Sequence, residues 1–284
     1  MSQHPSPPLG HHPDLAASSA TVSVPATTVW TGPDRVRAVD ALMVGAHPDL
    51  VGWLAAMDEQ TDPEQGRLGL HGRVLTQLVG GEPVTVIDVT AADGTGTWSQ
   101  VLAPWQPSPG SDGGYLGWVP SAHLASTGAA LAPDAAAPSA AAPTAGGPLA
   151  EPGAVGPSAS VSGEHPALPL AREHLGLRYL WGGLTPLGLD CSGLVHHTWR
   201  RLGLVVPRDA FAQAEASGAV VLDEVQPGDL YFFAHPDRRI HHVGIVVSRG
   251  RMLHASETGG VLVEEDLTPD RIATLVAAGR LPGP

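Results

Sequence analysis

The amino-acid sequence predicts an α+β catalytic domain that follows small, all-β, barrel-like modules. Residues 21–125 contain short β-rich runs punctuated by glycine and proline, a pattern typical of small barrels. Residues 126–163 are dominated by Ala, Pro, Gly and Ser and keep no helical or strand period, as expected of a linker. Residues 164–284 begin with helical patterns and continue with consecutive strands, which is typical of an α+β domain.

The amino-terminal half is predicted to consist mainly of short strands. Residues 73–90, RVLTQLVGGEPVTVIDVT, contain two β-rich runs separated by Gly80-Gly81, which predicts a β-hairpin. Further strands are expected in 97–104 and 114–124, and the segment 48–60 has a helical pattern. Residues 1–20 are expected to form a disordered tail.

The carboxy-terminal half begins with two predicted helices. The first ends at Gly176, and the second, CSGLVHHTWRRLG, starts at Cys191 and stops at Gly203. A closing helix is predicted over 268–280, with Thr268 as its N-cap and a proline in its first position. Four strands are expected between the helices, at 229–233, 242–248, 251–256 and 261–265.

Composition restricts the partners. A formal net charge of −13 argues against nucleic acid, which attracts a basic surface, and gives no support for binding an anionic membrane. No run approaches the length of a membrane helix, which is roughly 20 apolar residues. The first residues lack the charged and apolar regions of a secretory signal, so the chain as written is expected to be cytoplasmic, and secreted if the true start lies upstream.

Cys191 is the only cysteine, which excludes an intramolecular disulfide. It falls in the first turn of its predicted helix, with Asp190 at the N-cap. Backbone N–H groups and the helix dipole there favour a thiolate, which predicts a lowered thiol pKa, and the same N–H groups could hold an oxyanion. Judged alone, a single cysteine is more often a small buried core residue than a nucleophile.

A nucleophilic thiol needs a nearby imidazole, and the sequence offers His242 and His254 on successive predicted strands. A two-residue turn at Arg249-Gly250 would place His254 opposite Ile245, on the face away from His242. The two rings can therefore meet only if the hairpin contains a longer turn or a bulge.

Five ordered blocks, YLWGG…LDCSGLV, VPRDAFAQ, QPGDLYFF, HHVGIVV and MLHA, resemble the NlpC-type cysteine peptidases. These papain-like enzymes cut bacterial cell-wall peptides, and the match runs from about residue 165 to 267. The resemblance implies Cys191 as nucleophile, His242 as general base and His254 as the residue that orients it. It also implies that the Tyr179 hydroxyl helps to polarise the scissile carbonyl, and it implies no cofactor.

The amino-terminal half resembles a bacterial SH3-like domain over 67–125, and 21–66 could be a divergent first copy. Two such modules before an NlpC-type domain at 164–284 resemble the γ-D-glutamyl-L-diamino acid endopeptidases. That group cleaves short muropeptides with a free amino-terminal L-Ala, between D-Glu and the diamino acid. The implied partners are peptidoglycan stem peptides.

Several residues match substrate-binding positions of that group. Asp190, assisted by Ser192, is expected to bind the substrate ammonium. A carboxylate beside the thiol repels a thiolate, so its presence there suggests a separate function such as this one. Alternative interpretations stay open, since Arg208 could be a structural ion pair, and Tyr179 and Trp181 could be core aromatics. The remaining expected ligands are Trp181, Glu82, Tyr115, Arg208 and Asp209. The long linker puts fixed closure of the cleft by the SH3-like module in doubt.

The residues leave three other functions to compare. The 14 histidines suggest a metal hydrolase, but no HExxH occurs, and adjacent pairs such as His241-His242 project to opposite sides of a strand. A non-catalytic wall-binding protein would leave the catalytic positions without use. An acyltransferase with the same Cys/His site would differ only in the acceptor of the acyl group.

Overall fold

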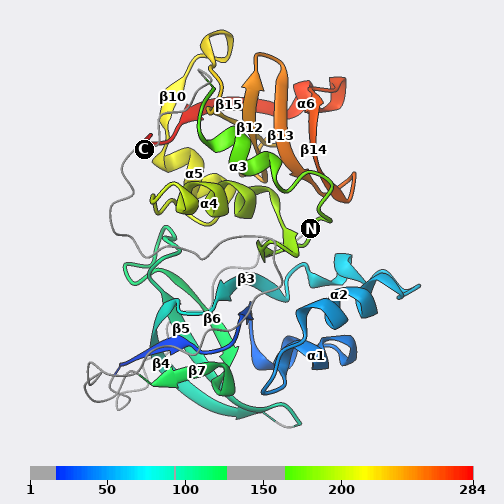
Figure 1. Ribbon diagram of the computed structural model, residues 1–284, viewed down its shortest axis with the longest axis vertical. Helices are drawn as coiled ribbons and strands as arrows, with labels where there is room; N and C mark the ends of the chain where they lie inside the picture. The colour runs from blue at the N-terminus through cyan, green and yellow to red at the C-terminus, as the bar shows by residue number, and fades with distance from the viewer. Residues whose placement is uncertain (1–16, 93, 127–163, 284) are drawn as a thin grey trace.

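The computed structural model describes residues 17–92, 94–126 and 164–283, which form two halves packed one on the other (Figure 1). The lower half in Figure 1 is the amino-terminal one, and the upper half contains the predicted catalytic domain. The predicted linker lies outside the described residues except for Ser126. The tail predicted over 1–20 also lies outside the described residues, except for 17–20. Residues 18–20 begin a strand and are not disordered as predicted.

The amino-terminal half contains one seven-stranded antiparallel sheet, in the order β3-β2-β6-β5-β4-β1-β7. Residues 21–66 do not form a sheet of their own, because their strand pairs with strands of 67–125. The SH3-like assignment of this half stays a prediction. The strands are β1 (Ser18–Val22), β2 (Ala26–Trp30), β3 (Val74–Val79), β4 (Pro83–Ala92), β5 (Gly96–Ala103), β6 (Tyr115–Pro120) and β7 (Leu124–Ser126).

The hairpin predicted around Gly80-Gly81 is wrong. The chain does turn there, and the Glu82 N–H donates to the Val79 carbonyl, but β3 and β4 do not pair with each other. Strand β3 pairs with β2, and β4 pairs with β1 and β5. The local turn signal was correct, but β3 pairs with a strand far earlier in the chain, and β4 pairs with β1 and with the strand that follows it.

Helix α2 (Leu50–Asp58) confirms the helical pattern predicted over 48–60. Asp49 caps it by accepting a hydrogen bond from Gly52 N at 2.8 Å, which satisfies one of the free N–H groups of the first turn. A short helix, α1 (Ala41–Val44), precedes it. Single 3₁₀ turns occur at Pro33–Arg35, Ala38–Asp40, Arg67–Leu70, Ser121–His123 and Leu222–Glu224.

The carboxy-terminal half is α+β, as predicted, with a six-stranded antiparallel sheet in the order β10-β15-β11-β12-β13-β14. In Figure 1, helices α4 and α5 lie between this sheet and the lower half. The helices are α3 (Ala167–Arg172), α4 (Cys191–Arg201), α5 (Ala210–Ala216) and α6 (Pro269–Thr274). The strands are β8 (Leu184–Thr185), β9 (Gly188–Leu189), β10 (Gly218–Val220), β11 (Leu230–Phe233), β12 (His242–Ser248), β13 (Arg251–Ser256), β14 (Val261–Asp266) and β15 (Leu275–Arg280).

The closing helix predicted over 268–280 is only half correct. Thr268 caps α6 as expected, accepting from Arg271 N at 3.4 Å, but the helix ends at Thr274. The next six residues form β15, which fills the position between β10 and β11 and pairs with both. A short apolar run fits a helix or a strand equally well, and here two open strand edges decided between them.

The core of this half lies where α3 and α4 cover one face of the sheet. Leu168 and Leu194 from these helices pack in one buried cluster with Ile245 of β12 and Leu253 of β13. Cys191 belongs to the same cluster, at the end of α4 that meets the start of β12. Helix packing therefore fixes where the thiol lies relative to the sheet.

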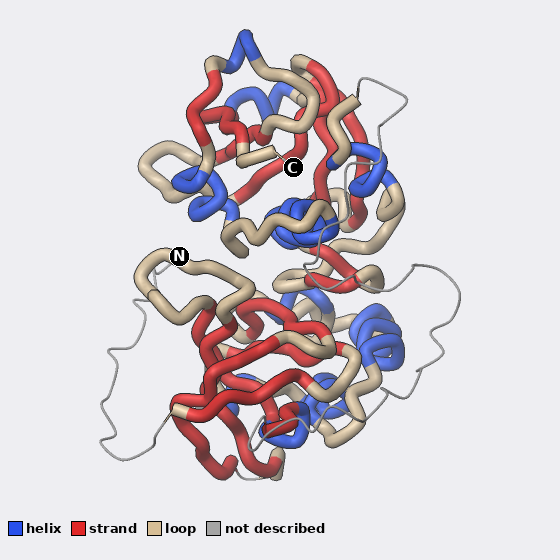
Figure 2. Tube along the Cα trace, turned by 60° about the vertical axis from the view of Figure 1, so that its left-hand side comes forward, coloured by secondary structure: helices blue, strands red, loops and turns tan. Residues whose placement is uncertain are grey.

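The two halves share a core, which answers the doubt raised by the long linker. Leu180 of the upper half belongs to a buried cluster of the lower half that includes Trp30, Trp53 and Trp98. Backbone also approaches closely, since a Cβ added to Gly182 would lie 2.7 Å from Cγ1 of Val74. Figure 2, turned by 60°, again shows the strand-rich lower half directly against the helices of the upper half.

Candidate active site

Cys191 is the first residue of α4 and follows the short β8–β9 hairpin. Asp190 precedes it in extended conformation and caps the helix by accepting a hydrogen bond from Gly193 N at 2.6 Å. A side chain at position 193 would not fit, because its Cβ would lie 2.3 Å from the carbonyl oxygen of Gly183. The sequence Asp-Cys-Ser-Gly thus holds the thiol in the first turn of the helix, as predicted.

The predicted lowering of the thiol pKa is wrong. Burial raises the pKa of the Cys191 thiol to about 12, and the negative charge of Asp190 raises it further, while hydrogen bonds from the backbone N–H of Val243 and Ser192 oppose the shift. Desolvation of the thiol and the negative charge of Asp190 therefore raise its pKa by more than the N-terminus of the helix lowers it. The resting thiol keeps its proton, so a neighbouring base must remove it during the reaction.

The bulge that the sequence required is present between β12 and β13. Ile245 pairs with Leu253, but Ser248 pairs with Arg251, so Val247 is an extra residue on its strand. This shift brings His242 and His254 onto one face, with Nε2 of the first ring 2.8 Å from Nδ1 of the second.

His242 also lies next to the thiol in the fold. It opens β12, and the N–H of the following residue, Val243, donates to the Cys191 sulfur. Burial lowers the pKa of His242 well below its usual value, with further lowering from the charges of His254 and Arg271. A neutral imidazole with a free Nδ1 is able to accept the thiol proton.

The second histidine has a partner that sequence reasoning missed. Nε2 of His254 lies 3.0 Å from a carboxylate oxygen of Glu265 on β14. Burial lowers the pKa of His254 to about 4, and the hydrogen bond to Glu265 opposes that shift. The available signal was the position of Glu265 on the strand after His254, where alternation places every second side chain on the same face.

Tyr179 lies beside the thiol, as expected. Its backbone is held by a hydrogen bond from its N–H to the Gly260 carbonyl at 2.9 Å, and its side chain is buried. Burial raises the pKa of its hydroxyl well above the usual value, and the next contribution comes from Cys191. The phenol therefore stays protonated and can donate a hydrogen bond near the sulfur.

The ammonium-binding role expected of Asp190 and Ser192 is not supported, because Arg208 occupies both. Its guanidinium is almost fully buried and donates to the two carboxylate oxygens of Asp190 at 3.0 and 2.7 Å, and to the Ser192 hydroxyl at 3.0 Å. The same side chain donates to Thr76 of the lower half at 2.7 Å. The structural ion pair considered for Arg208 in the sequence is present.

Glu82 and Trp181 also have protein partners where substrate contacts were expected. Glu82 is buried, forms an ion pair with Arg200 and accepts a hydrogen bond from Gln106 at 3.3 Å. Trp181 donates from Nε1 to the Val74 carbonyl at 2.9 Å and thereby joins the two halves. Spacing along the chain could not reveal these partners, because all of them come from distant segments.

Tyr115 and Asp209 are brought together from opposite halves. The Tyr115 hydroxyl lies 3.1 Å from each carboxylate oxygen of Asp209, the residue that precedes α5. Burial raises the pKa of Asp209, while Arg208 lowers it. Arg239 lowers the pKa of Asp209 as well. Among the residues that the structure describes, no arginine or histidine forms a direct ion pair with this carboxylate, so it is free to accept a further donor.

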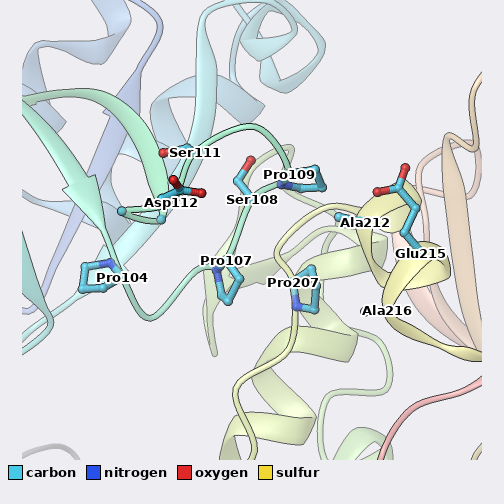
Figure 3. A pocket seen from close by; sticks show the side chains of 12 residues that line it. Pro104, Pro107, Ser108, Pro109, Ser111, Asp112, Pro207, Ala212, Glu215 and Ala216 are labelled. Atoms are coloured by element: carbon cyan, nitrogen blue, oxygen red, sulfur yellow. The ribbon is translucent and has the colours of Figure 1, made fainter.

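A cavity of about 440 Å³ lies between the 104–114 loop and α5 (Figure 3). Its lining includes Gly114 and Pro207, which flank the Tyr115–Asp209 contact in sequence, but neither Cys191 nor His242. It is therefore a hollow beside the candidate site and not the catalytic centre.

Two other kinds of site were considered over the described ranges. No group of three or more His, Cys, Asp or Glu side chains there is arranged to hold a metal ion. Within the same ranges, every helix is too short or too polar to cross a membrane.

Comparisons with known proteins extend over both halves. A family model described as the NlpC/P60 family matches residues 176–276. The γ-D-glutamyl-L-lysine dipeptidyl-peptidase of Bacillus subtilis (strain 168) is 32% identical over 275 residues, which cover 84% of this chain and 90% of that protein. The Bacillus cereus protein of the same name is 28% identical and covers 86% of this chain and 85% of its own length. A solved NlpC/P60 family protein from Bacillus cereus ATCC 10987 superposes with a TM-score of 0.72 at 25% identity, covering 93% of this chain and 100% of that one.

Proposed function

Because this chain belongs to the NlpC/P60 family and is a cysteine peptidase, we propose that it hydrolyses peptidoglycan-derived peptides at the γ-D-glutamyl–diamino acid bond. We further propose that it requires a free amino-terminal L-Ala on the substrate. The names of the two Bacillus relatives reported above support the bond, and the carboxylate of Asp209, which lies beside Tyr115 without a direct ion pair, supports the amino-terminal requirement.

The reaction begins with a protonated thiol and a neutral imidazole. Nδ1 of His242 takes the Cys191 proton as the sulfur attacks the γ-glutamyl carbonyl carbon, forming a tetrahedral intermediate. The backbone N–H of Cys191, in the first helical turn, and the Tyr179 hydroxyl donate hydrogen bonds to its oxyanion.

The intermediate then collapses with proton return. The C–N bond breaks, the His242 imidazolium gives its proton to the leaving amine of the diamino acid, and a thioester remains on Cys191. A water molecule, deprotonated by His242, attacks this thioester, and breaking of the C–S bond releases the γ-carboxyl product and the thiol.

Recognition of the amino terminus rests on charge. Asp209 is half-buried, and among the described side chains it is hydrogen-bonded by Tyr115 and forms no direct ion pair, so its carboxylate can receive a substrate ammonium. Tyr115 comes from the lower half, which makes docking of the two halves part of the specificity. Because Arg208 already forms an ion pair with Asp190, we assign the ammonium to Asp209 instead.

The test uses tri-, tetra- and pentapeptide stems with free or acetylated amino groups, with products identified by mass. We expect cleavage between D-Glu and the diamino acid, and a loss of about 100-fold in kcat/KM on acetylation, as for removal of one partner of a desolvated charge pair. Asp209→Asn should abolish most of this preference, whereas Asp223→Asn, which alters an exposed carboxylate paired with Arg249, should retain it. Wild-type indifference to the acetyl group would remove the amino-terminal requirement.

A further inference from the structure

Four side chains form a continuous line from the helix terminus across three strands. Cys191 lies against the start of β12, His242 contacts His254 on β13 at 2.8 Å, and His254 contacts Glu265 on β14 at 3.0 Å. We propose that Glu265 is a positioning residue that sets the ring tautomers of both histidines, so that Nδ1 of His242 is free to accept the thiol proton. The kinetic part of this proposal rests on the proposed function, whereas the tautomers do not.

The tautomers follow from hydrogen-bond chemistry. A carboxylate only accepts hydrogen bonds, so the Nε2 of His254 that faces Glu265 must carry a proton. In a neutral ring, Nδ1 of His254 is then an acceptor, and it can only receive the Nε2 proton of His242. Nδ1 of His242 is consequently left without a proton, which is the state that a general base requires.

The opposite arrangement shows why the carboxylate matters. If His254 carried its proton on Nδ1, it would donate to Nε2 of His242, and the His242 proton would sit on Nδ1. That ring could not accept a proton from Cys191. Glu265 excludes this arrangement, because the Nε2 lone pair of His254 would then face its oxygen atoms.

The sheet register singles out Glu265 among three consecutive acids. His254 pairs with Val263, and Glu265 pairs with Met252, so Glu265 is the diagonal neighbour of His254 on the same face. Glu264 and Asp266 point to the other face, where they form ion pairs with Arg251. In the described part of the chain, the side chain that Glu265 contacts at hydrogen-bond distance is His254, whose neutral ring is fully buried while the carboxylate is 38% exposed.

Charged groups around His242 and His254 both raise and lower the pKa values of the two rings. Arg271 of α6 lowers the pKa of His242 and of His254, and His241 lowers that of His242, while Glu265 is the acid that raises the pKa of His254. Once His242 has taken the thiol proton, the positive ring lies near Arg271, and the negative Glu265 offsets part of that repulsion.

The first experiment reads the tautomer without any substrate. Nitrogen NMR of histidine-labelled protein at neutral pH reports which ring nitrogen carries the proton, and the His254 signals are assigned by their loss in His254→Gln. We expect the proton on Nε2 in the wild type and a mixture of tautomers in Glu265→Gln, because an amide both donates and accepts. A wild-type proton on Nδ1 overturns the proposal, whether or not the peptide is a substrate and whether or not the variant folds.

The second experiment compares Glu265→Gln with Asp266→Asn, a matched loss of one acid on the same strand. We expect Glu265→Gln to lower kcat about tenfold with KM unchanged, as for loss of a group that orients a catalytic ring. It should also move the acidic limb of kcat/KM to lower pH, because the bond to Glu265 raises the pKa of His254. Asp266→Asn should change neither, and identical behaviour of the two variants overturns the proposal. An inactive wild type would count against the proposed function, and the NMR result would still decide the role of Glu265.

Discussion

Replacing Arg208 with methionine tests the buried network that joins the nucleophile's helix to the lower half. The substitution keeps an apolar side chain of similar length but removes the guanidinium, which donates to Asp190, Ser192 and Thr76. Asp190 is 7% exposed, so its charge would remain inside the protein without its cation.

The expected cost follows from that burial. Removal of one partner from a buried pair destabilises a protein by about 3–5 kcal/mol, because the remaining charge is left desolvated. The cap that Asp190 provides to Gly193 stays in place, so its contribution is not part of this cost. At a urea m-value of about 2–3 kcal/mol/M, the midpoint of unfolding should fall by about 1–2.5 M.

The assay is urea unfolding of the wild type, Arg208→Met, Asp190→Asn and the double variant. In the double variant both charges are absent, so it should lose at least about 1.5 kcal/mol less than the sum of the single variants. Arg249→Met, which breaks an exposed pair with Asp223, is the control and should match the wild type. Additive single effects, or a midpoint in Arg208→Met equal to that of the control, would refute the reasoning.

Three further predictions follow from the raised thiol pKa, the close docking of the halves and the buried histidines. Because the pKa of the Cys191 thiol is about 12, the rate of its alkylation by iodoacetamide should rise about tenfold per pH unit between pH 7 and 10. An alkylation rate that stays constant from pH 6 to 8 would instead indicate a resting thiolate. In urea unfolding, Gly182→Ala should destabilise the protein by about 1–3 kcal/mol more than Gly176→Ala. Both glycines have positive φ, but only at Gly182 would the added Cβ contact a neighbour, Val74. Equal losses of stability in the two variants would contradict close docking of the halves. Folded-state pKa values below the unfolded value of 6.5 mean that the unfolded chain binds protons first, so the stability that buried histidines contribute should be complete above pH 6.5 and fall as the pH drops towards 4, with net proton uptake on unfolding; urea midpoints that do not change over this range would contradict the burial. The most strongly shifted histidines are His196 and His197, each with a pKa of about 3, His254, with a pKa of about 4, and His242, whose pKa lies well below the usual value.

Local patterns were sufficient for the elements that carry the chemistry. Helix α4 begins at Cys191 and is followed by Gly203 in left-handed conformation, as the N-cap and C-terminal glycine signals predicted. The need for a bulge between His242 and His254 could also be derived, because strand alternation leaves only two possible faces. Periodicity and capping involve residues a few positions apart, which is why sequence alone defines them.

Long-range partners could not be read in the same way. The pairing of β3 with β2, the strand β15 in place of a helix, and the ion pair of Glu82 with Arg200 all depend on segments that meet only in the folded chain. The linker composition suggested separable modules, but the shared core around Leu180 docks the halves firmly.

The sequence by itself determined which residue is the thiol, which turn of which helix holds it, and which two histidines lie on the adjacent strands that could serve it. Only the tertiary structure decided the charges around them. Arg208 forms an ion pair with Asp190, and Glu265 contacts Nε2 of His254. Burial raises the pKa of the Cys191 thiol, which therefore keeps its proton. Spacing along a chain predicts neighbours within an element, whereas desolvation and ion pairing depend on what the rest of the protein brings to that point.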